Sequence, residues 1–552
     1  MFNYILYILS QLKNIFILKK EVNNNKMNLK LCNGIRSVIA AFLHQFSLYP
    51  LFMMSNIIPF IISYLYHIEK ESSSDNTSSL TQNDGYFIHP IMSLCMSIFC
   101  FFGGIVEHFL GPKLAVLMGG VGLVIGDILF IVSKNLIFDF VINICFGIGF
   151  GISMTAAVKN ATKYFPKKRG LINALVGAFG GNLGNSFFNL VIKYCVSKGD
   201  YPRDDDNNMY QKSTAQNYKI FLYIHGGIAM GFSIIAALLL VDFDTSENIS
   251  DGPSQNLLGK NNAIEKNEEK NEESDEKEHK KDVKKENKNT EEKGEKNNIE
   301  KITKKEKNKI IKVSTYEKKV NNPHYNKGLK QIFKCFDIYL ILLIFLLTAF
   351  LQGFIYTVGF NYGTMSHNND EGIESQNKIS PDNMSIIFML SYLISGLMGP
   401  FSGFIYDKLQ FRSTMIIIDA LSCINGILIN LTVKWGVYYY AISIILNGCL
   451  NSWAFSMIFP HVSKIFGFLY AGELYGFVVL STGISNLISS SVYYIISHFS
   501  DNKNNNAYFF IFISGSVCNI LAGVLAFFDK EKKFKFQIEE NDENKITNTE
   551  AY

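Results

Sequence analysis

Polar side chains recur at helical spacing inside long apolar segments of this sequence, where they could hydrogen-bond a polar solute. Gln45, Tyr49 and Asn56 are spaced four and seven residues apart, so they share one face of a helix. His44 lies beside them, and an ionisable group within an apolar segment indicates a functional site. The same amides could instead hydrogen-bond from helix to helix as packing contacts. The full set of stripes comprises His44, Gln45, Tyr49, Asn56, Asn182, Asn185, Asn189, Gln352, Tyr356, Asn447 and Asn451.

Acids and cations also recur at matched places beside glycines, in a pattern suited to ion pairing at helix ends. The stretch "GGIVEHFLGPK" covers residues 103–113, and "GFIYDKLQFR" covers residues 403–412. Each has a glycine, an acid one turn later (Glu107, Asp407) and a cation five or six residues beyond. One such stretch alone would be an ordinary solvated helix end. Two of them at corresponding positions indicate an internal repeat.

The segments that must position these residues are long and apolar. The chain has 552 residues, 48% of them hydrophobic. A bilayer core of about 30 Å needs about 20 apolar residues per helix. About twelve such spans are predicted, in two sets of six, which indicates an all-α membrane protein. They lie near Ile35–Tyr66, Phe87–Leu110, Leu114–Val132, Phe138–Val158, Leu171–Val196, Ile220–Val241, Ile338–Phe360, Met384–Tyr406, Thr414–Val433, Tyr438–Phe459, Leu474–Ser497 and Tyr508–Phe528.

Charge in the polar segments predicts the orientation. Lys113, the cluster at 163–169, Lys408 with Arg412, and Lys464 fall in alternate loops, and cytoplasmic loops are rich in Lys and Arg. Both termini and the central insert are therefore expected in the cytoplasm. The insert is a low-complexity Lys/Glu/Asn segment, expected to be disordered. The first 33 residues are expected to form an amphipathic or leader-like extension.

Several function classes are disfavoured by the sequence. No phosphate-binding G-x-x-x-x-G-K-[ST] motif is present, which argues against ATP-driven pumping. The nine cysteines form no C-x-x-C pair, so no zinc site or other cofactor is indicated. A net charge of +4 gives no indication of nucleic-acid binding. No catalytic constellation of His, Asp, Glu or Ser is found at one depth, so we do not expect an enzyme.

A third stretch extends the repeat into a family resemblance. Gly147, Gly149 and Gly151 precede "KYFPKKRG" (163–170), which a glycine-spaced helix follows, with Gly177, Gly180, Gly181 and Gly184. Together with the paired loops, these motifs make the chain resemble a major facilitator superfamily transporter. More narrowly, they and the text "SLYPLFMMSNIIPFIISYL" (47–65) resemble the monocarboxylate transporter and oxalate:formate antiporter branch. The departure in the first loop is Glu107, where the family motif usually has Asp.

The resemblance implies two six-helix halves around a central cavity, lined by the first and fourth helix of each half. The polar stripes are then candidate solute-binding residues. The glycines after Gly170 would let helices approach closely as one half rocks against the other. Asp127 and Asp419 are expected to join the loop contacts. The candidate gating residues are Gly103, Glu107, Gly111, Lys113, Arg169, Gly403, Asp407 and Arg412.

One feature of the branch is missing. Its members hold a carboxylate with a basic residue deep in the eighth, first or eleventh span, and spans eight and eleven of this chain have none. The remaining candidates for a buried cation are His44, His225 and Lys193, whereas His89 is expected at the membrane interface. A neutral or zwitterionic solute therefore competes with a monocarboxylate.

The sequence thus predicts a monomeric secondary active transporter in the plasma membrane or an organelle membrane, with membrane lipid and a small solute as its partners. Coupling to protons is left open. A nutrient sensor on a transporter fold is the alternative. The predicted organisation is an extension (1–33), a first half (34–241), a charged cytoplasmic linker (242–334), a second half (335–528) and a cytoplasmic tail (529–552).

Overall fold

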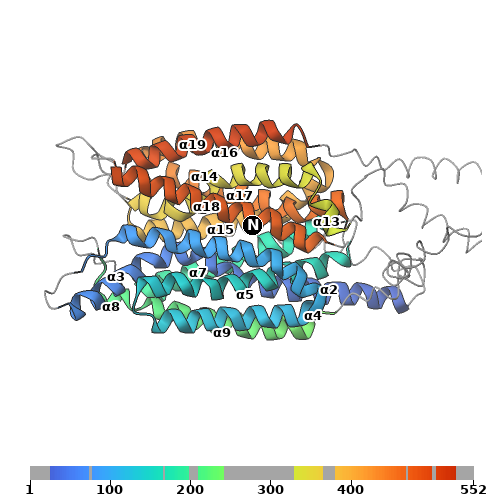
Figure 1. Cartoon of the computed structure of the whole chain (residues 1–552), viewed down its shortest axis with the longest axis horizontal. Helices are drawn as coiled ribbons and strands as arrows, with labels where there is room; N and C mark the ends of the chain where they lie inside the picture. The colour runs from blue at the N-terminus through green and yellow to red at the C-terminus, as the bar shows by residue number, and fades with distance from the viewer. Residues whose placement is uncertain are drawn as a thin grey trace, which may run out of the picture. The chain divides into compact units, whose positions relative to one another are not determined.

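A computed structural model describes residues 25–73, 78–165, 168–197, 209–241, 328–364, 379–467, 470–499 and 505–529. Most of the predicted extension, linker and tail lies outside these residues. Every regular element within the described ranges is helical, and the long helices run side by side in one bundle (Figure 1). Ten of these helices are long and apolar enough to cross a membrane, and a bent pair adds another.

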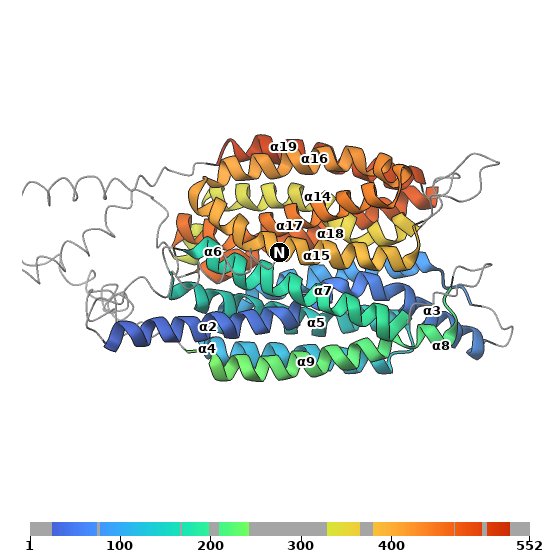
Figure 2. The same cartoon turned by 180° about the vertical axis from the view of Figure 1, so that it is seen from behind.

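The first half comprises the elements from α2 to α9, which contact one another extensively. Its bounds are α2 (Asn25–Leu48), η1 (Tyr49–Met53), α3 (Met54–Ser72), η2 (Gln82–Phe87), α4 (Ile88–Val132), α5 (Leu136–Lys163), α6 (Arg169–Asn173), η3 (Ala174–Gly180), α7 (Gly181–Val191), η4 (Ile192–Ser197), α8 (Lys212–Ala215) and α9 (Tyr218–Leu239). Figure 2 shows α2, α5, α7 and α9 lying together on one side of the bundle.

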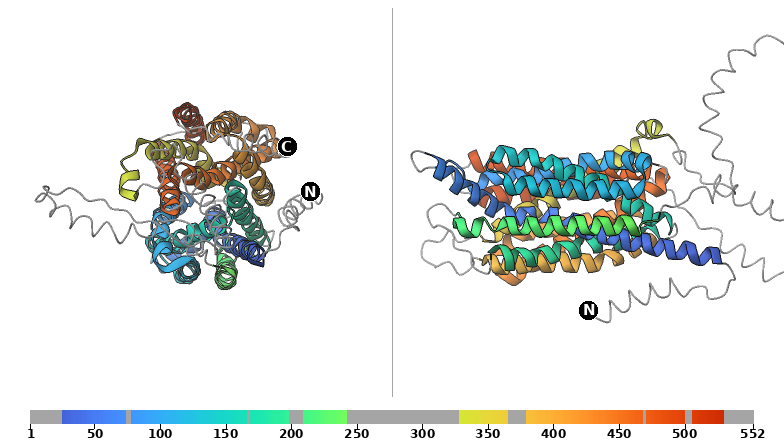
Figure 3. Two further views of the ribbon diagram at one scale, coloured as in Figure 1. Left: turned by 90° about the vertical axis from the view of Figure 1, so that its right-hand side faces the viewer. Right: turned by 90° about the horizontal axis from the view of Figure 1, so that it is seen from below.

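The second half follows the short helix α13 (Leu329–Ile332). It comprises α14 (Phe336–Thr364), α15 (Pro381–Lys408), α16 (Phe411–Trp435), α17 (Val437–Phe466), α18 (Ala471–Phe499) and α19 (Asn505–Ala526). Viewed along the helices, the two halves form separate groups that meet at the centre of the bundle (left view of Figure 3). The contacts between them run mainly along α4 with α18, and along α15 with α6, η3 and α7.

Two breaks explain how these helices correspond to the predicted spans. The 45 residues of α4 would extend roughly 68 Å at 1.5 Å per residue, far more than one bilayer needs. Gly111 interrupts this helix with φ +79°, a backbone conformation that glycine adopts readily, and Pro112 follows it. The two parts, 88–110 and 112–132, match two predicted spans. When α4 is counted as two spans and the bent pair as one, the described residues supply the twelve spans.

The first predicted span is not one continuous helix. It divides into a first part that ends at Phe52, formed by α2 and the turn η1, and a second part of α3 that begins at Asn56. The two parts are bent by 50°. Pro50 has no backbone N–H, so it cannot continue the hydrogen-bond pattern of α2, and the chain passes into the 3₁₀ turn η1. The single span expected over Ile35–Tyr66 is corrected to a broken one.

Local sequence defines several helix ends. The Asn135 side chain accepts a hydrogen bond of 2.8 Å from the backbone N–H of Ile137 at the start of α5. Ser380 accepts from the Asn383 N–H, and Pro381 begins α15. Gly467 follows α17 with φ +89°.

Large apolar side chains remain exposed on the outer faces of the bundle. Ile128, Leu238, Ile424 and Ile520 are 52–73% exposed: 54%, 73%, 52% and 55% respectively. Isolated exposed apolar residues are ordinary on a soluble protein, but a continuous apolar surface over several helices is not. Together with the length of the helices, this surface fits hydrocarbon rather than water.

Candidate functional site

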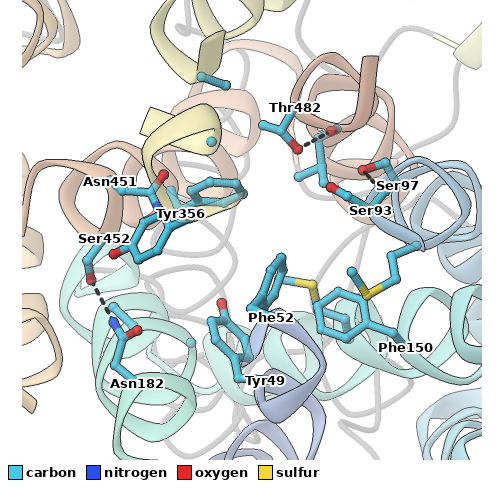
Figure 4. Close-up of a pocket in the computed structure, with 18 of the residues that line it drawn as sticks. Tyr49, Phe52, Ser93, Ser97, Phe150, Asn182, Tyr356, Asn451, Ser452 and Thr482 are labelled. Carbon is cyan, nitrogen blue, oxygen red and sulfur yellow. Dashed lines mark hydrogen bonds between the residues drawn. The ribbon is translucent and has the colours of Figure 1, made fainter. Parts of the chain in front are cut away.

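A cavity of about 1080 Å³, including space open to solvent, lies where the two halves meet. Both halves contribute to its walls: η1, α4, α5 and α7 from the first, and α14, α15, α17 and α18 from the second. Figure 4 shows Tyr49 and Phe52 facing Tyr356 and Asn451 across the open space. The break in the first span places the Tyr49 and Phe52 rings at this wall.

Hydrogen bonds between neutral groups connect the halves around the cavity. The amide nitrogen of Asn182 donates to Ser452 Oγ at 3.1 Å, and that of Asn486 donates to Ser93 Oγ at 3.0 Å. The Asn185 Oδ1 and His89 Nε2 atoms, also on cavity-lining residues, have no partner among the described residues. Because buried polar atoms are normally hydrogen-bonded, these two atoms stand out as lacking a partner beside the cavity.

Aromatic rings supply much of the remaining wall. Tyr49, Phe52 and Phe150 pack as one group, with Phe52 edge-on to Phe150 at 5.4 Å between ring centroids. On the opposite side, Tyr356 and Tyr392 stack at 5.5 Å. Such rings offer apolar faces together with phenol hydroxyls. The wall therefore combines flat apolar surfaces with uncharged hydrogen-bonding groups.

The eleven predicted binding residues separate into two groups. Five line the cavity: Tyr49, Asn182, Asn185, Tyr356 and Asn451. The other six contact neighbouring helices, as the packing alternative expects. They are His44 (to Ser233 Oγ, 3.3 Å), Gln45 (to Met154 O, 3.1 Å), Asn56 with Asn189 (3.2 Å), Gln352 (to Ser422 Oγ, 3.0 Å) and Asn447 (to Gln352 O, 3.4 Å).

The candidates for a buried cation lie elsewhere. His225 contacts Asp127 inside the first half, and Lys193 Nζ lies 5.5 Å from the Tyr194 ring centroid. His89, expected at the membrane interface, is only 2% exposed and lines the cavity. Its Nδ1 lies 3.3 Å from Thr357 Oγ1 of the other half. Among the cavity-lining residues that the structure describes, none is Lys, Arg, Asp or Glu.

A cluster of buried charges lies where α4 meets the start of α18. Lys159 Nζ is 2.6 Å from Glu107 Oε2 and 4.0 Å from Glu473 Oε2. Lys163 Nζ is 3.5 Å from Glu107 Oε1. The side chains of Lys159 and both acids are only 4% exposed. Because Glu473 belongs to the second half, Lys159 connects the halves through charge.

The second matched loop makes a different contact between the halves. Asp407 Oδ2 accepts a hydrogen bond of 3.3 Å from the backbone N–H of Leu171, in the first turn of α6. Arg169 Nη1 donates to Ser463 Oγ at 3.4 Å. Lys464 Nζ lies 4.1 Å from the Tyr406 ring centroid. We call the end of the bundle that carries Lys163, Arg169, Lys408 and Lys464 the basic end.

The predicted gating residues mostly gather at this end. Gly103 packs against the backbone of α5, since a Cβ there would overlap the Gly151 carbonyl, and Gly111 forms the break in α4. Lys113 is exposed. Glu107 has Lys159 and Lys163 as ion-pair partners. The Arg412 guanidinium lies 4.4 Å from the Phe527 ring centroid.

The expectation that Asp127 and Asp419 join these loop contacts is wrong. Asp127 pairs with His225, and Asp419 accepts a hydrogen bond of 2.8 Å from Thr348 Oγ1. Both contacts lie within one half, so neither acid links the matched loops to the other half.

Sequence reasoning missed Lys159 and Glu473. Lys159 directly follows the predicted span Phe138–Val158, so it read as part of the basic loop at 163–169, whereas the helix α5 continues to Lys163. Glu473 lies just after the short connection between α17 and α18 and belongs to none of the sequence motifs described above. The missed wall residues Ser93, Ser452 and Asn486 had no signal beyond a polar atom in an apolar segment.

The predicted close approach of the glycine-spaced helix is confirmed. A Cβ at Gly180 would lie 3.0 Å from the Phe42 ring, and one at Gly184 would overlap the Phe46 carbonyl. A Cβ at Gly181 would overlap the Tyr49 ring. These glycines therefore let η3 and α7 pack directly on α2 and η1.

Two helical halves, matched loops and a cavity between them define a multi-pass membrane protein of the transporter type. The sequence matches the family model of the Major Facilitator Superfamily over residues 39–374 and 338–549. The chain belongs to that superfamily. A comparison with curated proteins found no match.

Solved structures have the same fold at low sequence identity. One is the proton:xylose symporter XylE bound to 6-bromo-6-deoxy-D-glucose, with a TM-score of 0.55 and 11% identity over 90% of this chain and 95% of that one. Another is a mutant of the nucleoside transporter NupG, with a TM-score of 0.51 and 11% identity over 90% and 99%. At such identity the likeness is one of fold.

Proposed function

We propose that this protein is a secondary transporter that moves a small, neutral, polar solute through the central cavity by alternating access. The observation that carries the proposal is the uncharged wall of the cavity. An anion in such a site would have no Lys or Arg partner among the described lining residues, and an unpaired buried charge is costly. Amides, hydroxyls and aromatic faces suit a polyhydroxylated or heterocyclic solute.

The arrangement of the halves supports alternating access. Charged and polar contacts join them at the basic end, through Lys159 with Glu473 and through Asp407 with α6. Such contacts can break and reform as one half rocks against the other. We propose that the basic end faces the cytoplasm, since Lys and Arg favour that side, and that the charged linker connects the halves there.

His89 supports a second candidate, the monocarboxylate that the branch resemblance implies. His89 lines the cavity, and its buried Nε2 atom is unpartnered among the described residues. A protonated imidazole there would supply the charge that a carboxylate needs. This candidate predicts carboxylate transport that depends on His89 and on acidic pH.

Uptake by purified protein in proteoliposomes distinguishes the two candidates. The panel pairs sugars, nucleosides and neutral amino acids with lactate, pyruvate and formate. We expect saturable uptake of a neutral solute and no saturable carboxylate uptake. Saturable carboxylate uptake that His89→Gln abolishes would reject the neutral solute. His67→Gln is the matched control, because His67 contacts the Tyr210 carbonyl away from the cavity.

A further inference from the structure

The break in the first span places a proline three residues after Ser47, so the Ser47 carbonyl cannot accept the hydrogen bond of a 3₁₀ turn. In the 3₁₀ turn that follows α2, the carbonyl of Ser47 would pair with the N–H three residues on, but that residue is Pro50. The Ser47 carbonyl lies 3.2 Å from His225 Nε2 of α9. Tyr49 and Phe52, which line the cavity, follow within five residues. His225 therefore supports the point where the cavity wall begins.

The other nitrogen of the His225 ring contacts an acid. Its Nδ1 lies 2.8 Å from Asp127 Oδ2 and 3.1 Å from Asp127 Oδ1, on α4. The side chains of His225 and Asp127 are 1% and 3% exposed. One imidazole thus joins α2, α4 and α9 at a buried point, and neither of the paired residues is part of the cavity wall.

These contacts require a proton between the two side chains. A carbonyl oxygen only accepts, so Nε2 carries a hydrogen. Nδ1 then either donates to an ionised Asp127 or accepts from a protonated Asp127, and both arrangements place one proton between nitrogen and oxygen. If one proton leaves, the neutral ring keeps a single hydrogen and the pair acquires a net negative charge. With that hydrogen on Nε2, the lone pair of Nδ1 faces a buried carboxylate. With it on Nδ1, the Ser47 carbonyl loses its donor.

The groups around the pair do not replace this proton. On α2, His44 lies one turn before Ser47, and its Nδ1 is 3.3 Å from Ser233 Oγ of α9. Tyr49 follows on η1. From α7 and α9, the rings of Phe188 and Phe221 lie 5.5 Å and 6.0 Å from the His225 ring. The immediate surroundings are therefore apolar or neutral on the elements packed against the pair.

We propose that Asp127 and His225 form a proton-binding site that holds the broken first span against α4 and α9. The bound proton keeps the Ser47 carbonyl supported, and with it the positions of Tyr49 and Phe52. Loss of the proton releases this support and alters the cavity wall. The site is the point at which a proton would be coupled to the solute, and only this coupling rests on the proposed transport function.

The proton-binding step is tested without any solute, by the thermal unfolding midpoint of the full-length protein in detergent from mildly acidic to mildly alkaline pH. A proton held by the folded pair gives stability that is lost as pH rises. Asp127→Asn can donate from its amide to Nδ1, while Nε2 still donates to Ser47, so the contact remains without a dissociable proton. We expect the wild-type midpoint to fall relative to that of Asp127→Asn as pH rises.

Two further variants make the result decisive. His225→Gln removes the ring and with it the shared proton, so its midpoint should also lack the fall with pH expected of wild type. This variant serves if Asp127→Asn fails to fold. Glu71→Gln is the control, because Glu71 is an exposed acid of α3 that pairs with Lys212 rather than with a histidine. It should keep the wild-type profile. Parallel profiles for wild type and both pair variants, or a loss confined to Glu71→Gln, would overturn the proposal.

Coupling is tested separately in proteoliposomes, with the neutral solute found in the uptake panel. Wild type should accumulate the solute under an inward proton gradient. Asp127→Asn should still exchange labelled for unlabelled solute but lose the stimulation by the gradient. Equal stimulation of uptake by the gradient in wild type and Asp127→Asn would show that the pair does not couple protons to the solute. A panel without any transported solute would reject the proposed function, whereas the unfolding profiles would still decide whether the pair binds a proton.

Discussion

Gly403 on α15 and Gly170 at the start of α6 lie so close that a Cβ on Gly403 would be 2.5 Å from the Gly170 carbonyl oxygen. The matching loop makes the corresponding crossing, where a Cβ on Gly472 would lie 3.5 Å from the Cα of Gly104. In each crossing, the helix that carries the matched glycine and acid in one half meets the start of a helix from the other half. These pairs are α15 with α6, and α4 with α18. A contact between the halves therefore recurs at both matched loops, through Gly403 in one and through Gly104, the residue after the repeat glycine Gly103, in the other.

The first prediction concerns the tightness of this crossing. We expect Gly403→Ala to destabilise the protein by about 1–3 kcal/mol, because the added methyl group meets backbone atoms that cannot move aside easily. The measurement is the unfolding midpoint in detergent. Gly227→Ala is the control, since no heavy atom lies within 4 Å of a Cβ at that helical glycine. Equal midpoints for the two variants would contradict a tight crossing.

The second prediction concerns the buried charges at the other crossing. Lys159→Met leaves Glu107 and Glu473 without their shared cation, and breaking a buried ion pair costs about 3–5 kcal/mol. Lys212→Met removes one partner of an exposed pair with Glu71 and should cost at most about 1 kcal/mol. Thermal unfolding of both variants gives the comparison. A small effect of Lys159→Met, similar to that of Lys212→Met, would show that Lys159 does not stabilise the cluster.

Hydropathy was sufficient to predict the spans and the two halves, because membrane crossing imposes length and polarity on each helix separately. Hydropathy did not predict the break at Tyr49–Met53, although Pro50 lies in that segment and Pro59 follows it in α3. Proline is tolerated in membrane helices when neighbouring groups bond the freed carbonyls. In this chain His225 Nε2 supplies the donor for the Ser47 carbonyl. The sequence does not indicate this partner, because the contact depends on how α9 packs on α2.

The cavity was predictable only in part, for a similar reason. Asn447 and Asn451 lie one turn apart on α17 and read alike in the sequence, yet only Asn451 lines the cavity. Asn447 donates instead to the Gln352 carbonyl of α14. Helical periodicity gives the spacing of a stripe, whereas the neighbour that each residue faces depends on how the helices cross.

The third prediction uses these two asparagines. Asn451→Ala should raise the KM for the transported solute about tenfold, the equivalent of about 1.4 kcal/mol from one lost hydrogen bond to the solute. Asn447→Ala should leave the KM unchanged and lower the unfolding midpoint instead. Uptake at varied solute concentration in proteoliposomes measures both. If the KM rises equally for the two variants, lining of the cavity does not distinguish binding residues from packing residues.

The last prediction concerns Asp407, which accepts the Leu171 N–H across the halves. Asp407→Asn weakens this contact with the positive end of α6, a loss of about 1 kcal/mol for a helix cap. Because the proposed cycle breaks this contact when the basic end opens, we expect the maximal uptake rate to fall about fivefold, the rate equivalent of that energy. The solute KM should stay within error of wild type, since Asp407 does not line the cavity. Asp139→Asn is a suitable control, because this buried acid of α5 lies outside both crossings. A raised KM with an unchanged maximal rate would assign Asp407 to solute binding rather than to closure.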